Sequence, residues 1–282
     1  MKTDTSHETE NFQRTVRDFW ESRGAASPHT DARLTMLSEH ARYTDYVHRQ
    51  EMRYLDPWIT KLGRPHVLDV GCGYGRLAFA LAERCRAIVG LDGSSSLIKL
   101  ATERAQREVV KNVSFSVRDV LEPYREGQFD LVVCSGLFSC LTDEQSRGGL
   151  QWMLDALIPG GLLYIRNNVS NGERFERRTS SPAVYRNGEE YKRLVSEQGF
   201  EILDERYLFA PLCAPNVAYY HVIPKALRDR EPASTLLDVW FELEAKTSEA
   251  RLKWLGDVYP YLLRALGKPT SFRVIVARRP LS

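Results

Sequence analysis

The chain has 282 residues, and its 39 basic and 37 acidic residues leave a formal net charge of +2. Such a balance gives no electrostatic support for a nucleic-acid-binding protein, so no nucleic-acid partner is expected. Hydrophobic residues make up 43% of the chain and charged residues 27%, which is typical of a folded globular protein and excludes wholesale disorder.

The N-terminal part of the sequence predicts helices. Residues 1–10 are polar and are expected to form a disordered tail. Residues 11–62 are interpreted as an N-terminal helical cap, because apolar residues recur there at helical spacing. The segment 24–28, which contains glycine and proline, separates two helical stretches.

From residue 66 the pattern changes to short apolar runs that alternate with amphipathic stretches. Strands that alternate with helices predict a parallel sheet with helices on both faces. Residues 63–210 and 269–282 are expected to form this α/β core. The predicted strands of its first part cover residues 66–70, 87–91, 113–117, 129–134 and 161–166.

A long segment, 211–268, lies between a strand expected at 200–209 and a last strand expected at 272–277. It is too long for a plain turn. Apolar residues at helical spacing predict a helix near 234–255. The segment is therefore interpreted as a helical insertion before the last strand.

The five cysteines are scattered and form no CxxC pair, so neither a disulfide framework nor a metal site is expected. The polar first residues do not resemble a secretory signal. No apolar run reaches the roughly 20 residues that span a bilayer. These features predict a cytoplasmic protein with no membrane partner, and they leave the oligomeric state open.

A glycine-rich loop follows the first predicted strand, with Gly71, Gly73 and Gly75 at its alternate positions. Glycine permits a tight turn and close approach of a ligand, and a helix N-terminus offers free N–H groups. A dinucleotide fingerprint would require Gly or Ala at position 76, which is Arg76 here. The spacing therefore favours another ligand that carries a carboxylate or phosphate.

Acidic residues accompany the loop. Asp69 precedes it within the strand and could face an ammonium group of a ligand. Asp92 ends the next strand and could accept both hydroxyls of a ribose. Asp119 follows the third strand and could accept from an adenine amino group, with Val120 against the ring. Helix capping and solvation remain alternative roles for these acids.

Five segments in order resemble the motifs of class I, Rossmann-like S-adenosylmethionine-dependent methyltransferases. They are VLDVGCGYG, VGLD, VRDV, FDLVVCSG and LIPGGLLYI. The resemblance covers about residues 65–210 and the final strand. It implies a seven-stranded, mostly parallel sheet with helices on both faces, and an antiparallel last strand beside the fifth.

The resemblance also implies a cofactor, S-adenosylmethionine, and its binding residues. Asp69 and the glycine loop would hold the methionine end. Asp92 and Gly93 would hold the ribose, and Asp119 and Val120 the adenine. Ser135, at the end of the fourth strand, is placed with these residues.

Candidate acceptor residues lie near the ends of the fourth and fifth strands and in the insertion 211–268. Methyl transfer from a sulfonium depends largely on positioning, although an oxygen acceptor usually also needs a base. His221 is the candidate base, while strand capping and packing remain alternative roles for all of these residues. The candidate substrate-binding residues are Phe138, Arg166, Asn168, Tyr219 and Tyr220.

The sequence therefore predicts methyl transfer to an oxygen or nitrogen atom of a small molecule, with specialised metabolism as the expected setting. Two alternatives remain. The segments 140–143 and 165–168 resemble those of protein N-terminal amine methyltransferases, but Cys140 and Thr179 stand where that family has His and Asp. The second alternative is a non-catalytic S-adenosylmethionine-binding protein.

Overall fold

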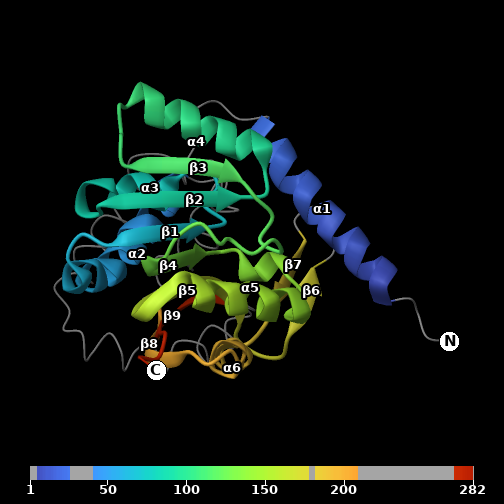
Figure 1. Cartoon of the computed structure of the whole chain (residues 1–282). Helices are drawn as coiled ribbons and strands as arrows, with labels where there is room; N and C mark the ends of the chain where they lie inside the picture. The colour runs from blue at the N-terminus through green and yellow to red at the C-terminus, as the bar shows by residue number, and fades with distance from the viewer. Residues whose placement is uncertain (1–4, 26–40, 178–181, 209–269, 282) are drawn as a thin grey trace.

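The computed structural model describes residues 5–25, 41–177, 182–208 and 270–281, and shows a twisted sheet enclosed by helices (Figure 1). The strands of the main sheet are β1 (His66–Val70), β2 (Ala87–Asp92), β3 (Val113–Val117), β4 (Phe129–Ser135), β5 (Leu157–Ser170), β8 (Glu201–Tyr207) and β9 (Thr270–Arg278). The helices are α1 (Thr5–Ala25), α2 (Ala41–Leu62), α3 (Arg76–Leu81), α4 (Ser95–Arg107), α5 (Asp143–Ala156) and α6 (Gly188–Glu197).

The sheet has seven strands in the order β3-β2-β1-β4-β5-β9-β8. Strands β1 to β5 pair in parallel, whereas β9 pairs antiparallel to both β5 and β8. This confirms the expected seven-stranded, mostly parallel sheet with an antiparallel last strand beside the fifth. The parallel ends bring the residues after β1, β2, β3 and β4 to one edge of the sheet, where ligands bind in open α/β sheets.

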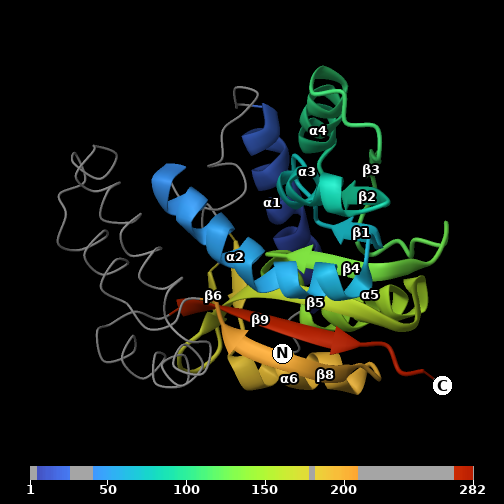
Figure 2. The ribbon, with the colours of Figure 1, turned by 90° about the vertical axis from the view of Figure 1, so that its left-hand side faces the viewer.

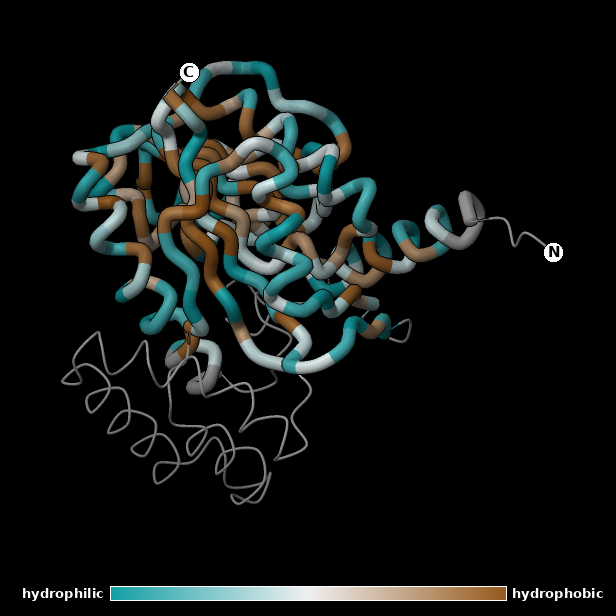
Figure 3. The backbone as a smooth tube through the Cα atoms, turned by 90° about the horizontal axis from the view of Figure 1, so that it is seen from below, coloured by the Kyte–Doolittle hydropathy of each residue, from teal (hydrophilic) through white to brown (hydrophobic). Residues whose placement is uncertain are grey.

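Helices cover both faces of the sheet, with α2 and α3 on one face and α5 and α6 on the other (Figure 1, Figure 2). Strand β4 shows why: its residues Leu131 to Cys134 are all buried, as expected for a strand covered on both sides. In Figure 3, the hydrophobic segments of the backbone trace gather toward the centre of the sheet and its helices.

Helix α1 and strand β5 extend well beyond the boundaries expected from the sequence. Helix α1 begins at Thr5, so residues 5–10, expected in a disordered tail, are helical. No glycine or proline interrupts 5–10, and extending an existing helix is easier than starting one. Strand β5 continues to Ser170 because its ladder with β9 runs on to the pair Ser170 and Thr270.

A small hairpin, β6 (Phe175–Arg177) and β7 (Ala183–Tyr185), was not predicted from the sequence. A short 3-10 helix, η3 (Phe138–Cys140), follows β4. The segment 211–268, expected to be helical, lies outside the described residues. Among the described helices, none combines the length and apolar content that crossing a membrane requires.

Candidate functional site

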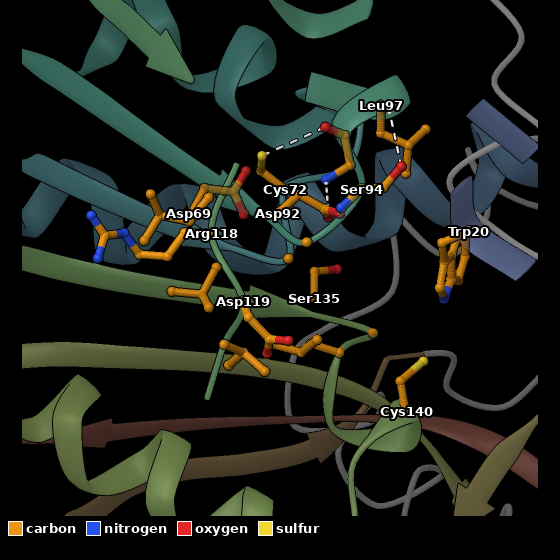
Figure 4. A pocket seen from close by; sticks show the side chains of 18 of the residues that line it. Trp20, Asp69, Cys72, Asp92, Ser94, Leu97, Arg118, Asp119, Ser135 and Cys140 are labelled. Carbon is orange, nitrogen blue, oxygen red and sulfur yellow. Dashed lines mark hydrogen bonds between the residues drawn. The ribbon is translucent and has the colours of Figure 1, made fainter. Parts of the chain in front are cut away.

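A pocket opens at the carboxyl ends of β1, β2, β3 and β4, and α1 supplies one of its walls (Figure 4). Most residues expected to bind the cofactor line this pocket. They are Asp69, Gly71, Gly73, Asp92, Gly93, Asp119, Val120 and Ser135. The predicted loop and the predicted acids therefore come together in space.

The three loop glycines adopt positive φ angles of 73° at Gly71, 56° at Gly73 and 85° at Gly75, a region that disfavours other residues. Gly75 does not line the pocket. It caps the N-terminus of α3, where an added Cβ would lie 2.7 Å from the ring of Phe79. Gly71 and Gly73 thus present backbone to the ligand, and Gly75 shapes the turn behind them.

The carboxylate of Asp92 is fixed by two backbone amides. Its Oδ2 accepts from the amide of Gly73 at 2.9 Å, and its Oδ1 from the amide of Ser94 at 2.9 Å. Burial raises the pKa of Asp92, although these hydrogen bonds oppose the rise. The glycine loop and the α4 N-terminus therefore meet at one oriented carboxylate inside the pocket.

Asp69 is 3% exposed, and its Oδ2 makes no hydrogen bond to any residue that the structure describes. Burial raises the pKa of this carboxyl to about 7, against the opposing charge of Arg76. A buried polar atom without a partner is destabilising, and a ligand cation would relieve that. The ammonium group of adenosylmethionine is a positively charged donor, which is the partner that this carboxylate oxygen lacks among the described residues. The residues therefore fit the implied cofactor.

Asp119 and Val120 lie together at another side of the pocket. Asp119 accepts from the amide of Leu121 at 3.0 Å, and Arg17 of α1 lies 3.9 Å from its other oxygen. The carbonyl oxygen of Val120 accepts from the indole of Trp152 at 2.8 Å. This corner combines an acid, an apolar side chain and an aromatic ring, a lining that suits a flat ring with a polar edge.

Helix α1 contributes Gln13, Val16, Arg17 and Trp20 to the lining. Its position is fixed by Glu21, whose carboxylate accepts from the hydroxyls of Ser94 and Ser95, both at 2.8 Å. Burial alone would raise the pKa of Glu21, but the hydrogen bonds of these serines and Ser96 lower it. A carboxylate at the N-terminus of α4 is also favoured by the helix dipole.

Sequence reasoning missed a buried ionic cluster beside the pocket, centred on Glu51 of α2. Glu51 is 0% exposed; its Oε2 accepts from Arg76 at 2.6 Å, and its Oε1 from Arg166 at 3.1 Å and Ser135 at 2.6 Å. Burial alone would raise the pKa of Glu51, but Arg166 and Arg76 outweigh it and lower the value to about 2. In the sequence, Glu51 resembles any polar residue of an amphipathic helix.

The candidate acceptor residues are not brought together at the pocket. Phe138 is 1% exposed and packs in the core, and Arg166 is 3% exposed and held by Glu51 and Ser135. Asn168 pairs with Phe272 in the ladder between β5 and β9. None of these three lines the pocket. Tyr219, Tyr220 and His221 lie outside the described residues.

The cysteines that the structure describes are buried and unpaired: Cys72, Cys85, Cys134 and Cys140. Cys140 and Cys72 line the pocket. Burial raises the pKa of both thiols, which are therefore neutral near pH 7. Within the described segments, no group of three His, Cys, Asp or Glu side chains gathers in a way that could hold a metal ion.

Comparison with known proteins gives a family match. A family model described as a methyltransferase domain matches residues 64–209. The ubiquinone biosynthesis O-methyltransferase of Coxiella burnetii is 33% identical over 114 residues, which are 40% of this chain and 47% of that protein. Phosphoethanolamine N-methyltransferase 1 of Triticum aestivum is 27% identical over 184 residues, 64% of this chain and 36% of that protein. This chain spans about half the length of the first of these relatives.

Solved structures share the fold. The [4+2]-cyclase SpnF superposes with a TM-score of 0.57 at 18% identity, covering 97% of this chain and 95% of that chain. At such identity the likeness shows the fold alone.

Proposed function

The chain belongs to the class I S-adenosylmethionine-dependent methyltransferases, and we propose that it methylates an oxygen or nitrogen atom of a small molecule. The observation that carries this proposal is the buried oxygen of Asp69, which has no hydrogen-bond partner in the described part of the chain and lies in the same pocket as the oriented Asp92. These two acids match the two polar ends of a nucleoside attached to an amino acid.

When bound, the cofactor would supply an activated methyl group to an oxygen or nitrogen atom of the acceptor. The protein residues provide position and exclusion of water. Asp69 would orient the ammonium, Asp92 the ribose and Asp119 the adenine. Holding two reactants in line contributes up to about 7–11 kcal/mol to catalysis.

The remaining lining favours an acceptor with an apolar body. Val16, Trp20, Leu137, Cys140 and Leu141 contribute mostly carbon and sulfur to the pocket. Figure 4 shows Trp20 and Cys140 together on one side of it, away from Asp69. Cys140 stands where methyltransferases of peptide amines have His. Its neutral thiol cannot serve as the base that would remove the proton from an amine acceptor. This supports a small molecule over the alternative of a protein or peptide amine.

The similar proteins support both oxygen and nitrogen as acceptor atoms, since one is named for O-methylation and another for N-methylation. The second alternative, a cofactor-binding protein that transfers no methyl group, is decided by a transfer assay, because a shared fold does not fix the reaction.

A labelling experiment tests the proposal. The purified chain is incubated with methyl-labelled S-adenosylmethionine and, in separate reactions, an apolar phenol, an apolar hydroxyquinoline, phosphoethanolamine and a peptide with a free N-terminus. We expect label in an apolar small molecule. Label in the peptide alone would establish the amine alternative, and binding of cofactor without any transfer would establish the second one. The variant Asp92→Ala serves as the control without cofactor.

The pKa of Asp69 predicts how cofactor binding depends on pH. A pKa raised to about 7 means that the carboxyl is protonated below that value and ionised above it. The ammonium of the cofactor binds the ionised form, so affinity for S-adenosylhomocysteine is expected to rise up to about tenfold per pH unit between about pH 5.5 and 7. Titration calorimetry should also detect proton release at the lower pH.

The matched variant is Asp69→Asn, which keeps the shape and loses the titration. Its affinity should be lower at neutral pH and nearly constant over the same range. A wild-type affinity that does not vary with pH would contradict this role of Asp69.

Helix α1 provides a further prediction. Glu21→Ala removes the carboxylate that caps α4 and fixes α1, and is expected to lower the free energy of unfolding by about 0.5–2 kcal/mol. Affinity for S-adenosylhomocysteine should fall as well, since Val16 and Trp20 lose their support. Thermal unfolding and calorimetry measure both effects. Asp18→Ala, an exposed residue of the same helix, should change neither, and equal effects of the two variants would refute the role of Glu21.

A further inference from the structure

A single buried arginine holds the pocket wall that follows β4. Arg186, directly after β7, is 0% exposed. Its two terminal nitrogens donate to the carbonyl oxygen of Phe138 at 2.8 Å and to that of Leu141 at 2.7 Å. Its Nε donates to Asp143 at 2.7 Å. One guanidinium therefore connects both ends of η3 to the first residue of α5.

Asp143 also binds a second arginine. Arg174, just before β6, donates to its other oxygen at 2.7 Å. Burial alone would raise the pKa of Asp143, but the hydrogen bonds of Arg174 and Arg186 lower it. Both ends of the β6–β7 hairpin are thus attached to one carboxylate. The two arginines differ in one respect, because the structure shows bonds to the carbonyls of the wall only for Arg186.

The segment that Arg186 holds faces the pocket. Leu137, Cys140 and Leu141 line the pocket. The carbonyl oxygen of Cys140 accepts from Gln13 of α1 at 3.2 Å, and its thiol is hydrogen-bonded by Trp20. Cys140 is therefore the point where the wall meets α1, on the side where Figure 4 shows Trp20.

We propose that Arg186 is a positioning residue for methyl transfer, which fixes the wall of Leu137, Cys140 and Leu141 against the acceptor. The proposal rests on the proposed function, since it concerns the acceptor side of the same pocket. A displacement of about 1 Å at a reacting centre can lower the rate by about 10²-fold. Lysine keeps the charge but cannot reproduce the planar fork that reaches three acceptors.

The first test reads the wall directly and needs no acceptor. Arg186→Lys, Arg174→Gln and the wild type are treated with iodoacetamide, and the alkylation of each cysteine is followed by peptide mass spectrometry. Cys140 and Cys72 are 8% and 6% exposed, so Cys72 is an internal reference in the same pocket. We expect alkylation of Cys140 to be about tenfold faster in Arg186→Lys, because at least one charged hydrogen bond is lost. Cys72 should be unchanged, and Arg174→Gln should match the wild type.

Two results of this test would overturn the proposal. Equal acceleration at Cys140 and Cys72 would mean a general loosening of the fold, and no acceleration would mean that Arg186 does not hold the wall. The affinity of each variant for S-adenosylhomocysteine is measured on the same samples, and an affinity equal to that of the wild type shows that the cofactor site is intact. A chain that binds cofactor and transfers no methyl group would still give this result, so the two proposals fail separately.

The second test uses the acceptor found by labelling. Arg186→Lys is expected to lower kcat by about 10²-fold while KM for S-adenosylmethionine stays within about threefold, because the wall and not the cofactor site has moved. Arg174→Gln should retain the wild-type kcat. Unchanged kcat in Arg186→Lys, with Cys140 exposed, would show that the wall does not control the reaction.

Discussion

Replacing Glu51 with alanine is expected to lower the free energy of unfolding by about 3–5 kcal/mol, because it leaves two buried arginines without their carboxylate. Arg76 and Arg166 are 11% and 4% exposed in their side chains and both bind Glu51. Too little water reaches the Arg166 side chain at such burial to replace the lost charge. Denaturant unfolding of the two proteins measures the difference.

The matched control lies on the same helix. Asp56 pairs with Arg84 at the surface, where the side chains are 44% and 35% exposed. Because solvent screens such a pair, Asp56→Ala should lower stability by about 0–1 kcal/mol. A loss for Glu51→Ala as small as that for Asp56→Ala would refute the importance of the cluster.

The acid titration of Glu51 gives the same prediction a second readout. Its pKa is lowered from 4.5 to about 2, so its stabilising contribution is complete above 4.5 and is lost as the pH falls toward 2. The stability difference between the wild type and Glu51→Ala should therefore shrink in acid. A difference that stays constant over this window would contradict the ionised state of Glu51.

Replacing Asp92 with alanine is expected to weaken binding of S-adenosylhomocysteine by about 100- to 10,000-fold. Two hydrogen bonds from a ribose to an ionised carboxylate contribute about 1.5–3 kcal/mol each, and Asp92 is already oriented by Gly73 and Ser94. The half-buried Asp119 already pairs with Arg17, so Asp119→Ala should weaken binding by less than about tenfold. Calorimetry with the same ligand compares the variants.

A second variant separates binding from loop structure. Asp92→Asn keeps one oxygen, which can accept from the amide of Gly73 or from that of Ser94 but not from both, and it loses the charge. It should therefore disturb the loop less than alanine does and still bind the ligand weakly. Binding by Asp92→Ala within about threefold of the wild type would refute the assignment of the ribose site.

The N-terminal helix connects these predictions. Glu21 and Asp92 both contact Ser94, one through its hydroxyl and the other through its amide. The acid expected to bind the ribose and the acid that fixes α1 therefore meet at one residue. Cofactor binding and the closeness of Val16 and Trp20 to the pocket should depend on each other for this reason.

The sequence by itself determined the sheet and the cofactor end of the site. Strands β1, β4 and β5 follow from apolar runs buried on both faces, whereas β3 at the sheet edge is largely exposed. The loop of Gly71, Gly73 and Gly75 follows from the positive φ angles at which other residues are strained. Asp69 and Asp92 could be predicted because each lies at or next to the end of a strand. The residues that follow each of them in the sequence form the loop that lines the pocket.

The tertiary structure alone decided which distant residues meet. Glu51 and Arg166 are separated by 115 residues, and Arg186 and Phe138 by 48, so no local pattern relates them. Phe138 and Arg166 were expected at the acceptor because they lie near strand ends. Folding instead packs Phe138 of η3 into the core and holds the Arg166 side chain against Glu51 and Ser135. A charged side chain can be buried only where folding brings it an oppositely charged partner. Such partners are distant in the sequence, so only the tertiary structure identifies them.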